Sequence, residues 1–308
     1  MQISAAGPDP LKLRQALPPA LDRIIVRFRG GLGNQLFQLA AALTVAKGNG
    51  AAVHFATDNY SRAVRNIKYR GLPKRKFDLD NVLQFDNPFT DLDIPTKVAL
   101  DFERKGHAGL ASIFRRLGGK SLLTEFGNVT KLKPGPSKTL VIEGFFQADS
   151  WVAPVLPIVQ TMFQRRFRDY NSEHADTLSE VVGIHIRRGD YTSGLFDVEP
   201  MPLDLVAQAR KNCGQKRAII FTDDPTWAHE HLDIFGNASV WDGPDPIKTF
   251  FAMTRCRELI IANSSFSWWA ARLSTHVEQV YCPSQWYKSG APYYGSENYL
   301  YPSDWIRY

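Results

Sequence analysis

The chain has 308 residues, 44% of them apolar and 22% charged, which is ample material for one large or two mid-sized folded domains. A net charge of +6 is too small to indicate nucleic-acid binding, although it suits an anionic ligand or an anionic surface. Three cysteines without a C-x-x-C spacing argue against a disulfide framework or a zinc site and favour a reducing compartment.

The beginning of the chain lacks the pattern of an export signal. Residues 1–22 have no cationic start followed by an apolar core, and no apolar run reaches the ~18 residues that a membrane span needs. We therefore expect a flexible tail over 1–22, no transmembrane segment and a cytoplasmic protein.

Strand and helix patterns alternate along the first half, in the order of a βαβ unit with parallel strands. Only the stretch from 59 to 138 has an irregular pattern with several Gly and Pro, and we expect no regular element there. The segments that carry the patterns are strands at 23–28, 51–55 and 139–147 and helices at 35–47 and around 154–167.

The second half repeats this alternation. The chain is therefore predicted to have an α/β fold with two Rossmann-like domains facing a cleft, an N-terminal domain over 23–168 and a C-terminal one over 169–308. The segments are strands at 181–187, 217–224, 258–263 and 279–283 and helices at 202–212, from 224, at 246–257 and at 265–274.

The first motif, Gly30-Gly31-Leu32-Gly33-Asn34-Gln35, lies between a strand and a helix. Glycines there permit a positive φ and a close ligand, and the helix start exposes unpaired N–H groups. Gly31, Gly33 and the later Asp58 partly mimic a dinucleotide fingerprint, but Leu36 stands where the third glycine belongs. An NAD- or FAD-binding oxidoreductase is thus a weak alternative, as is a tight turn without a ligand.

The second motif covers 185–191, at the exit of a predicted central strand. Alternation along a strand places His185 and Arg187 on one face and Arg188 on the other. The structural alternative is an Arg188–Asp190 ion pair beside a core histidine. For Arg187 we favour function, because open α/β sheets bind ligands at the carboxyl ends of their strands and a guanidinium fits phosphate with two parallel bonds.

The third motif, 221–225, offers two adjacent carboxylates. Asp224 followed by Pro225 is typical of a helix cap and first helical position, which favours a structural role over a metal site. Asp223 is kept as a candidate ligand contact.

The fourth motif, 263–269, again joins a strand exit to a helix. Successive hydroxyls and exposed N–H groups at a helix start can cradle a phosphate. The structural alternative is serine capping beside buried tryptophans, and we expect both to hold, with Trp268 and Trp269 packing.

These motifs, in this order, resemble glycosyltransferase family 11, the α-1,2-fucosyltransferases. The resemblance covers nearly the whole chain after the tail, except for 59–138. It is carried by GGLGNQLFQ (30–38), GFFQ (144–147), HIRRGDY (185–191), FTDD (221–224), MTRCRELIIANSSFSWWAARL (253–273), PSQW (283–286) and DWI (304–306).

The resemblance implies an inverting galactoside α-1,2-fucosyltransferase, which moves L-fucose from GDP-fucose to the 2-hydroxyl of a terminal galactose on a glycan. It implies the GT-B fold, with the donor on the C-terminal domain and the acceptor site on the N-terminal one, no metal and no cofactor besides the donor. The implied catalytic residues are Arg187, on the β-phosphate, and Asp190. The implied donor-binding residues are His185, Arg187, Arg188, Asp223, Asp245 (on guanine), Ser264, Ser265, Phe266 and Ser267, and the acceptor-side residues are Gly31, Gly33, Asn34 and Gln35.

The chemistry agrees with these roles. Breaking the fucosyl–oxygen bond places negative charge on the departing phosphate, and a fixed guanidinium stabilises that charge more in the transition state than in the ground state. The general base stays open among Asp190, Asp197, Glu199 and Glu143, and a dissociative mechanism with a weak base is a further option.

Other functions stay open at this point. They are transfer of another GDP-sugar and a glycan-binding module without turnover. The cations at 62–76 suggest peripheral contact with a membrane that carries a lipid-linked or lipopolysaccharide acceptor, although a solvated surface is the commoner reason for such a run. The oligomeric state is not predicted.

Overall fold

The computed structural model describes residues 2–3, 21–61, 75–126, 129–168, 175–214, 216–291 and 299–308. The described residues divide into two compact units. Unit 1 holds those within Met1–Arg65, Lys74–Leu79 and Phe85–Ile158, and unit 2 holds those within Asp80–Gln84 and Val159–Tyr308. This division falls inside a helix, whereas the sequence places the boundary after that helix, at 168/169; the domain bounds stay a prediction.

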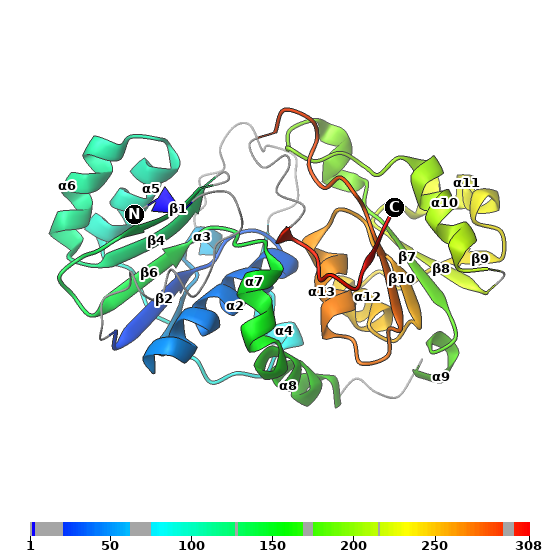
Figure 1. Cartoon of the computed structure of the whole chain (residues 1–308), viewed down its shortest axis with the longest axis horizontal. Coiled ribbons are helices and arrows are strands. Elements are labelled where there is room, and N and C mark those ends of the chain that lie inside the picture. Colours follow the sequence, from blue (N-terminus) through cyan, green and yellow to red (C-terminus); the bar gives the residue numbers. More distant parts are fainter. Residues whose placement is uncertain are drawn as a thin grey trace. The chain divides into compact units, whose positions relative to one another are not determined.

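Unit 1 is built on a six-stranded sheet in the order β1-β5-β4-β6-β2-β3 (Figure 1). The four strands from β4 to β3 are parallel, while β5 runs antiparallel to β4 and β1 antiparallel to β5. The strands are β1 (Gln2–Ile3), β2 (Arg23–Arg27), β3 (Ala52–Ala56), β4 (Ser121–Phe126), β5 (Val129–Lys133) and β6 (Thr139–Glu143).

The helices of unit 1 bury apolar side chains against this sheet. Phe37, Leu39 and Ala40 of the long helix α2 are fully buried, as are Ile24 and Val26 of the neighbouring β2. The helical segments are α2 (Leu32–Asn49), α3 (Asp58–Ser61), α5 (Ile94–Arg104), α6 (Ala108–Gly118), α7 (Asp149–Val152) and η2 (Ala153–Val155), with α4 (Leu79–Val82) and α8 (Leu156–Phe167) running across the division.

Unit 2 carries an all-parallel sheet in the order β12-β11-β10-β7-β8-β9. The chain starts at the central strand β7, adds β8 and β9 on one side, and returns to add β10, β11 and β12 on the other, which is the Rossmann order. The strands are β7 (Val182–Ile186), β8 (Ala218–Thr222), β9 (Ala238–Val240), β10 (Glu258–Ile260), β11 (Gln279–Cys282) and β12 (Ile306–Arg307).

The connections of unit 2 are helices, as parallel neighbours require. They are α9 (Ala175–Leu178), η4 (Gly189–Ser193), α10 (Leu203–Asn212), α11 (Pro225–Glu230), η5 (Leu232–Phe235), α12 (Pro246–Met253) and α13 (Ser265–Leu273). The predicted α/β class with two Rossmann-like units is confirmed, and the short strands β9 and β12 are additions that no pattern indicated.

The prediction of irregular structure between 59 and 138 is wrong. This stretch contains the helix pair α5–α6 and the β4–β5 ladder. The Gly and Pro residues that suggested irregularity are the ends of regular elements: Pro95 lies in the first turn of α5, Gly106 separates the two helices at φ 79°, and Gly119 caps α6 at φ 67°.

Among the described helices, none combines the length and the apolar character needed to cross a bilayer. Of the predicted tail, only Gln2–Ile3 and residues 21–22 fall within the described residues.

Candidate active site

The central strands of unit 2 present two sequence motifs at one point of the sheet. β7 and β10 are parallel neighbours from which the chain departs in opposite directions, and such a switch point is where open α/β sheets bind ligands. Residues 187–191 follow β7 and residues 263–267 follow β10. The hydroxyl of Tyr191 donates to the carbonyl oxygen of Asn263 at 3.0 Å and ties the two exits together.

Arg187 lies just beyond the end of β7, between two carboxylates. Its Nη2 is 2.6 Å from Oδ1 of Asp190, and its Nη1 is 2.8 Å from Oδ2 of Asp223. Nε also donates to Asp190, at 3.1 Å. Because a guanidinium has five N–H groups, these contacts leave one on each Nη nitrogen for a ligand. Burial opposes the charge of Arg187, but Asp223 and Asp190 outweigh burial and raise its pKa, so the side chain is a fixed cation.

The structural alternative of an Arg188–Asp190 ion pair is wrong. Asp190 pairs with Arg187, whereas Arg188 stacks over Trp227 at 4.0 Å and pairs with Asp224 at 3.2 Å. The alternation argument fails here because β7 ends at Ile186 and Arg188 begins the 3-10 turn η4. The two arginines nevertheless have separate partners.

Asp223 and Asp224 both make contacts that stabilise the fold. Asp224 caps α11 by accepting the N–H of Trp227 at 3.2 Å, with Pro225 in the first turn, as predicted. Asp223 accepts the backbone N–H of Arg188 at 2.9 Å and pairs with Arg187. A side chain at Gly189 would place its Cβ 2.3 Å from Oδ2 of Asp223, so the sequence needs glycine there.

His185, on β7, is a buried candidate. Burial, with a smaller contribution from Arg187, lowers its pKa to about 3, so the imidazole is neutral near pH 7. Its Nδ1 is buried and has no hydrogen-bond partner among the described residues. Its ring lies 5.9 Å from that of Phe266 at the start of α13. A neutral ring with an unused nitrogen can donate to or accept from a bound ligand.

The start of α13 has open N–H groups. Ser264 is the N-cap, and its side chain makes no capping bond. Ser265 and Phe266 are half-buried. Ser267 is fully buried, and its hydroxyl bonds to the carbonyl oxygens of Ala262 and Ser264, which favours a structural role over ligand contact. The predicted packing of Trp268 and Trp269 is confirmed, since both are fully buried.

Asp245, the candidate for guanine, lies at the start of α12. Its Oδ1 caps that helix by accepting the N–H of Ile247 at 2.8 Å. A pocket is lined by His185, Arg187, Arg188, Trp227 and residues of 200–206, but not by Asp245.

No group of three or more potential metal ligands occurs among the residues that the structure describes. The metal-free reaction stays a prediction.

In unit 1 the glycine-rich turn follows β2, which has the parallel neighbours β6 and β3. Gly30 adopts φ 81°, and a Cβ on it would lie 2.7 Å from Nδ2 of Asn34. Gly31 is the N-cap of α2 and Gly33 is buried in its first turn. Gln35 is fully buried and its amide bonds to the backbone of Gly30, Lys76 and Asp78, so it holds the turn in place.

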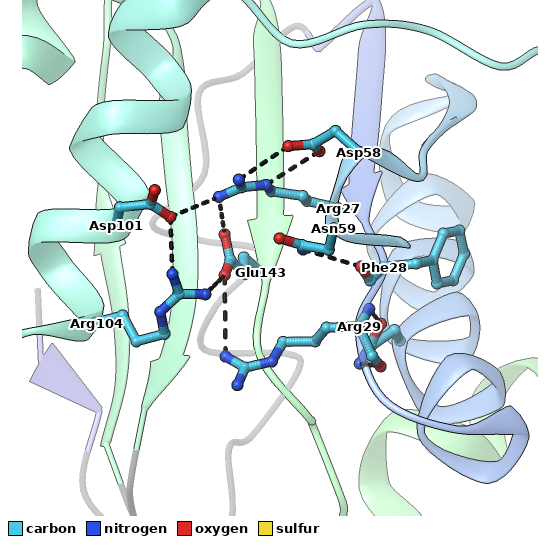
Figure 2. Close-up of polar contacts among 9 residues, drawn as sticks. Arg27, Phe28, Arg29, Asp58, Asn59, Asp101, Arg104 and Glu143 are labelled. Atoms are coloured by element: carbon cyan, nitrogen blue, oxygen red, sulfur yellow. Dashed lines mark hydrogen bonds and ion pairs between the residues drawn. The ribbon is translucent and has the colours of Figure 1, made fainter. Parts of the chain in front are cut away.

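A charged cluster surrounds Arg27 at the end of β2 (Figure 2). Of its members, the sequence motifs singled out only Asp58, for another role, and Glu143. Arg27, fully buried, is 2.9 Å from Asp58, 3.0 Å from Glu143 and 3.3 Å from Asp101. Arg104 reaches Glu143 at 3.4 Å. Burial opposes the charge on Arg27, but Glu143 and Asp58 raise its pKa well above its ordinary value. Glu143 is fully buried and held by two guanidinium groups, which disfavours it as a general base.

Arg29 joins the cluster to the surface. It approaches Glu143 at 3.9 Å, stacks over Phe145 at 4.8 Å and is 28% exposed. Gln38 bonds to both the N–H and the carbonyl oxygen of Arg29, at 3.0 Å each.

The GFFQ motif (144–147) contains the one described non-glycine residue with a positive φ. Phe146 has φ 53°, costly for a bulky side chain, and its N–H donates to Oε1 of Glu125 at 2.6 Å. The next residue, Gln147, donates to Oδ1 of Asn34 at 2.7 Å. Glu125 therefore holds a strained turn that positions Asn34. Only the tight pairing of β4 with β6 brings Glu125 here, and no sequence signal marked it.

The remaining candidate residues lie away from these contacts. Asp197 and Glu199 are exposed. Of the cations at 62–76, only Arg75 and Lys76 are described, so membrane contact through that segment lies outside the described residues and stays a prediction.

Curated proteins with related sequences are named as glycosyl-, colitosyl- and fucosyltransferases. The chain is 27% identical to the O-antigen biosynthesis glycosyltransferase WbnK of Escherichia coli, over 84% of this chain and 93% of that one. It is 24% identical to an α-1,2-colitosyltransferase of Escherichia coli, over 86% and 92%. It is 22% identical to a galactoside 2-α-L-fucosyltransferase of Caenorhabditis elegans, over 84% and 71%.

The model of glycosyl transferase family 11 matches residues 125–307, more than half of the chain, including the whole switch point of unit 2. The chain therefore belongs to glycosyl transferase family 11.

Proposed function

We propose that the chain transfers L-fucose from GDP-fucose to a glycan hydroxyl with inversion at the anomeric carbon, and that this hydroxyl is the 2-OH of a terminal galactose. Family membership supports glycosyl transfer. Relatives named for α-1,2-colitosyl transfer and galactoside 2-α-L-fucosyl transfer support the linkage. The observation that supports donor binding is the position of Arg187, which two carboxylates hold at the switch point of unit 2.

Arg187 would act on the leaving group. As the acceptor oxygen bonds to the anomeric carbon, the bond from that carbon to the β-phosphate oxygen breaks, and GDP leaves with the electron pair. The two N–H groups that Arg187 has to spare face the growing charge on that phosphate. Asp190 and Asp223 hold the guanidinium in one orientation, so little reorganisation is needed as the charge develops.

The remaining donor contacts follow from the same place in the fold. The backbone N–H groups after Ser264, with Ser265 and Phe266, take the diphosphate. His185, neutral and with an unused Nδ1, and Asp223 take polar atoms of the nucleotide. Arg188 supports the site through its stacking on Trp227. Asp245 can offer guanine only Oδ2 without losing its cap.

On unit 1, we assign the acceptor to the turn at 31–34. Asn34 is the polar side chain that the turn leaves half-buried, and Gly31 keeps the backbone at the start of α2 accessible to a sugar, while Gly33 packs behind it. Gln35 acts through the shape of the turn. The acceptor proton would go to Asp190, Asp197 or Glu199, or to water.

A closely related deoxysugar donor is the second candidate, favoured by the resemblance to the colitosyltransferase. The experiment that separates the two is a screen of GDP-sugars with galactose-terminated oligosaccharides, in which the linkage of the product is determined by NMR. We expect transfer from GDP-fucose and an α-1,2 linkage. A linkage to another hydroxyl contradicts the acceptor assignment, and a clear preference for another GDP-sugar contradicts the donor assignment.

A thermal-shift series with GDP, UDP and CDP tests the nucleotide independently of turnover. GDP should raise the melting temperature more than the other two. Equal stabilisation by UDP or CDP would remove the support for guanine recognition, and bound flavin or NAD would revive the oxidoreductase alternative.

A further inference from the structure

One helix of unit 1 exposes a row of large apolar side chains. Leu110, Ile113 and Leu117 on α6 are 47%, 56% and 69% exposed. Their spacing of three and four residues places them on one stripe of the helix. Large aliphatic side chains scattered singly on a surface are ordinary, but three on adjacent turns of one short helix form a patch.

This row is not the face that holds α6 in the fold. Ala111 is the buried residue of the helix, and Phe114 packs against the core and stacks on Phe102 of α5 with ring centroids 5.8 Å apart. The apolar face of α6 is thus wider than its contact with α5: Ala111 and Phe114 form the packed edge, and Leu110, Ile113 and Leu117 form an edge left outside. A fourth exposed aliphatic side chain, Ile94 at 75%, begins α5 near the end of α6.

The charged side chains of α6 and of its immediate flanks in the sequence have one sign. Residues 104–120 include Arg104, Lys105, Arg115, Arg116 and Lys120 and no Asp or Glu. Some of these cations are bound elsewhere: Arg104 pairs with Asp101, and Lys120 with Asp93. Lys105 and Arg116 are exposed and form no ion pair with any described acidic residue.

We propose that the α6 face, defined by Leu110, Ile113, Leu117, Lys105 and Arg116, docks the protein on a bilayer that contains anionic phospholipid. A helix with aliphatic side chains on one face and cations beside them is the pattern that inserts shallowly at the boundary between headgroups and acyl chains. The exposed cations meet the negative headgroups, and the net charge of +6 draws the whole chain toward such a surface.

The charges disfavour a second copy as the occupant. In a twofold dimer through this face, Lys105 and Arg116 of one protomer would meet the same cations of its partner, with no acidic residue of 104–120 between them. The proposal is independent of the proposed function, because it needs no property of the sugar site.

Flotation of the whole chain with vesicles tests the proposal. Vesicles of phosphatidylglycerol mixed with phosphatidylcholine are compared with vesicles of phosphatidylcholine alone. We expect binding to the anionic vesicles that weakens with added salt, and much weaker binding to the neutral ones. Failure to bind the anionic vesicles overturns the proposal.

Two pairs of variants locate the contact. Ile113→Ser with Leu117→Ser removes the apolar stripe, and Lys105→Glu with Arg116→Glu reverses the charges; each pair should lower vesicle affinity roughly tenfold or more. All four residues are exposed, so the fold should persist. Matched controls are Ile158→Ser with Ile234→Ser, and Lys211→Glu with Arg217→Glu, also exposed and outside this face.

Three results contradict the proposal. One is equal loss of binding in the controls. Another is loss of binding on charge reversal at Arg65 and Lys68 while the α6 variants still bind, which would move docking to the 62–76 segment. The third is a dimer in solution that the α6 variants dissociate, which would make the face an interface between copies. Sugar transfer to a soluble acceptor should be unchanged in the α6 variants, which separates this test from that of the proposed function.

Discussion

Each unit places an arginine at or just past the carboxyl end of an interior strand of its sheet, yet the two arginines differ in what surrounds them. Arg27 is the last residue of β2, fully buried, and contacts three carboxylates (Figure 2). Arg187 follows the last residue of β7, has two carboxylate partners and is 23% exposed.

The difference follows from position relative to the strand. A side chain within β2 points into a layer between sheet and helices, where Asp101 of α5 and Glu143 of β6 enclose it. A side chain just past β7 lies at the sheet edge, where nothing in unit 2 covers it completely. The same residue type is thus structural in one unit and available to a ligand in the other.

The largest expected effect comes from breaking the buried cluster. Arg27→Ala leaves Glu143 buried with weaker compensation and should cost about 3–5 kcal/mol of stability. A denaturant titration and the melting temperature measure this loss. Arg187→Ala is the matched comparison and should change stability far less, because Arg187 is 23% exposed and its partner Asp223 is 26% exposed, so water can replace part of the lost contact. Equal losses of stability in the two variants would show that the two arginines do not differ in role.

The second effect concerns turnover. Arg187→Ala should lower kcat about 10²-fold or more, because the charge on the leaving phosphate loses its fixed partner. Arg187→Lys should restore activity only in part, since an ammonium cannot span two phosphate oxygens. Arg188→Ala, which removes a stacked surface pair, should affect the melting temperature more than kcat. Near-normal turnover of Arg187→Ala together with loss of activity in a folded Arg188→Ala would reverse the assignment.

Sequence patterns predicted much of the fold because the strands of unit 2 are short apolar runs bounded by turn residues, and because each motif stands at a strand exit. They missed α5 and α6, because Pro95, Gly106 and Gly119 at the ends of these helices suggested an irregular stretch. They also missed β12, which is two residues long.

The site was partly predictable for a similar reason. Arg187, Asp223 and the start of α13 follow strands, and the ends of parallel strands meet at one edge. Partners set by tertiary contact were not predictable: the pairing of Asp190 with Arg187, the role of Glu125 and the closed cluster around Glu143 depend on side-chain directions that local pattern does not specify.

The third effect is the pH dependence of stability, which should have opposite signs for Glu125 in unit 1 and His185 in unit 2. Burial raises the pKa of Glu125 to about 7, above its ordinary 4.5, although the hydrogen bonds from Phe146 and Thr130 act in the opposite direction. Between those two values the folded chain keeps a proton that the unfolded chain releases, so the contribution of Glu125 to stability falls as pH rises through that window. His185 behaves oppositely: its lowered pKa makes the contribution fall as pH drops below about 6.5.

Glu125→Gln removes the first of these dependences and keeps an acceptor for the N–H of Phe146. The stability of the variant relative to the parent should therefore increase between about pH 5 and about pH 8. Glu180→Gln, at a glutamate that is 75% exposed, is the control and should show no such trend. A flat difference for Glu125→Gln would mean that its carboxyl titrates like an exposed one.

The smallest expected effect is that of a chelator. In unit 2 the carboxylates that a divalent ion would need are already engaged, Asp223 by Arg187 and the N–H of Arg188, and Asp224 by the cap of α11 and the side chain of Arg188. An ion between them would have to displace cations that are held at 2.8 and 3.2 Å. In the proposed reaction Arg187 supplies the charge that a metal supplies elsewhere, and sugar transfer in excess EDTA should therefore match transfer without it. If EDTA abolished transfer and Mg²⁺ or Mn²⁺ restored it, Arg187 would share the leaving phosphate with a metal ion. The contrast between the buried Arg27 and the partly exposed Arg187 would then no longer explain the reaction.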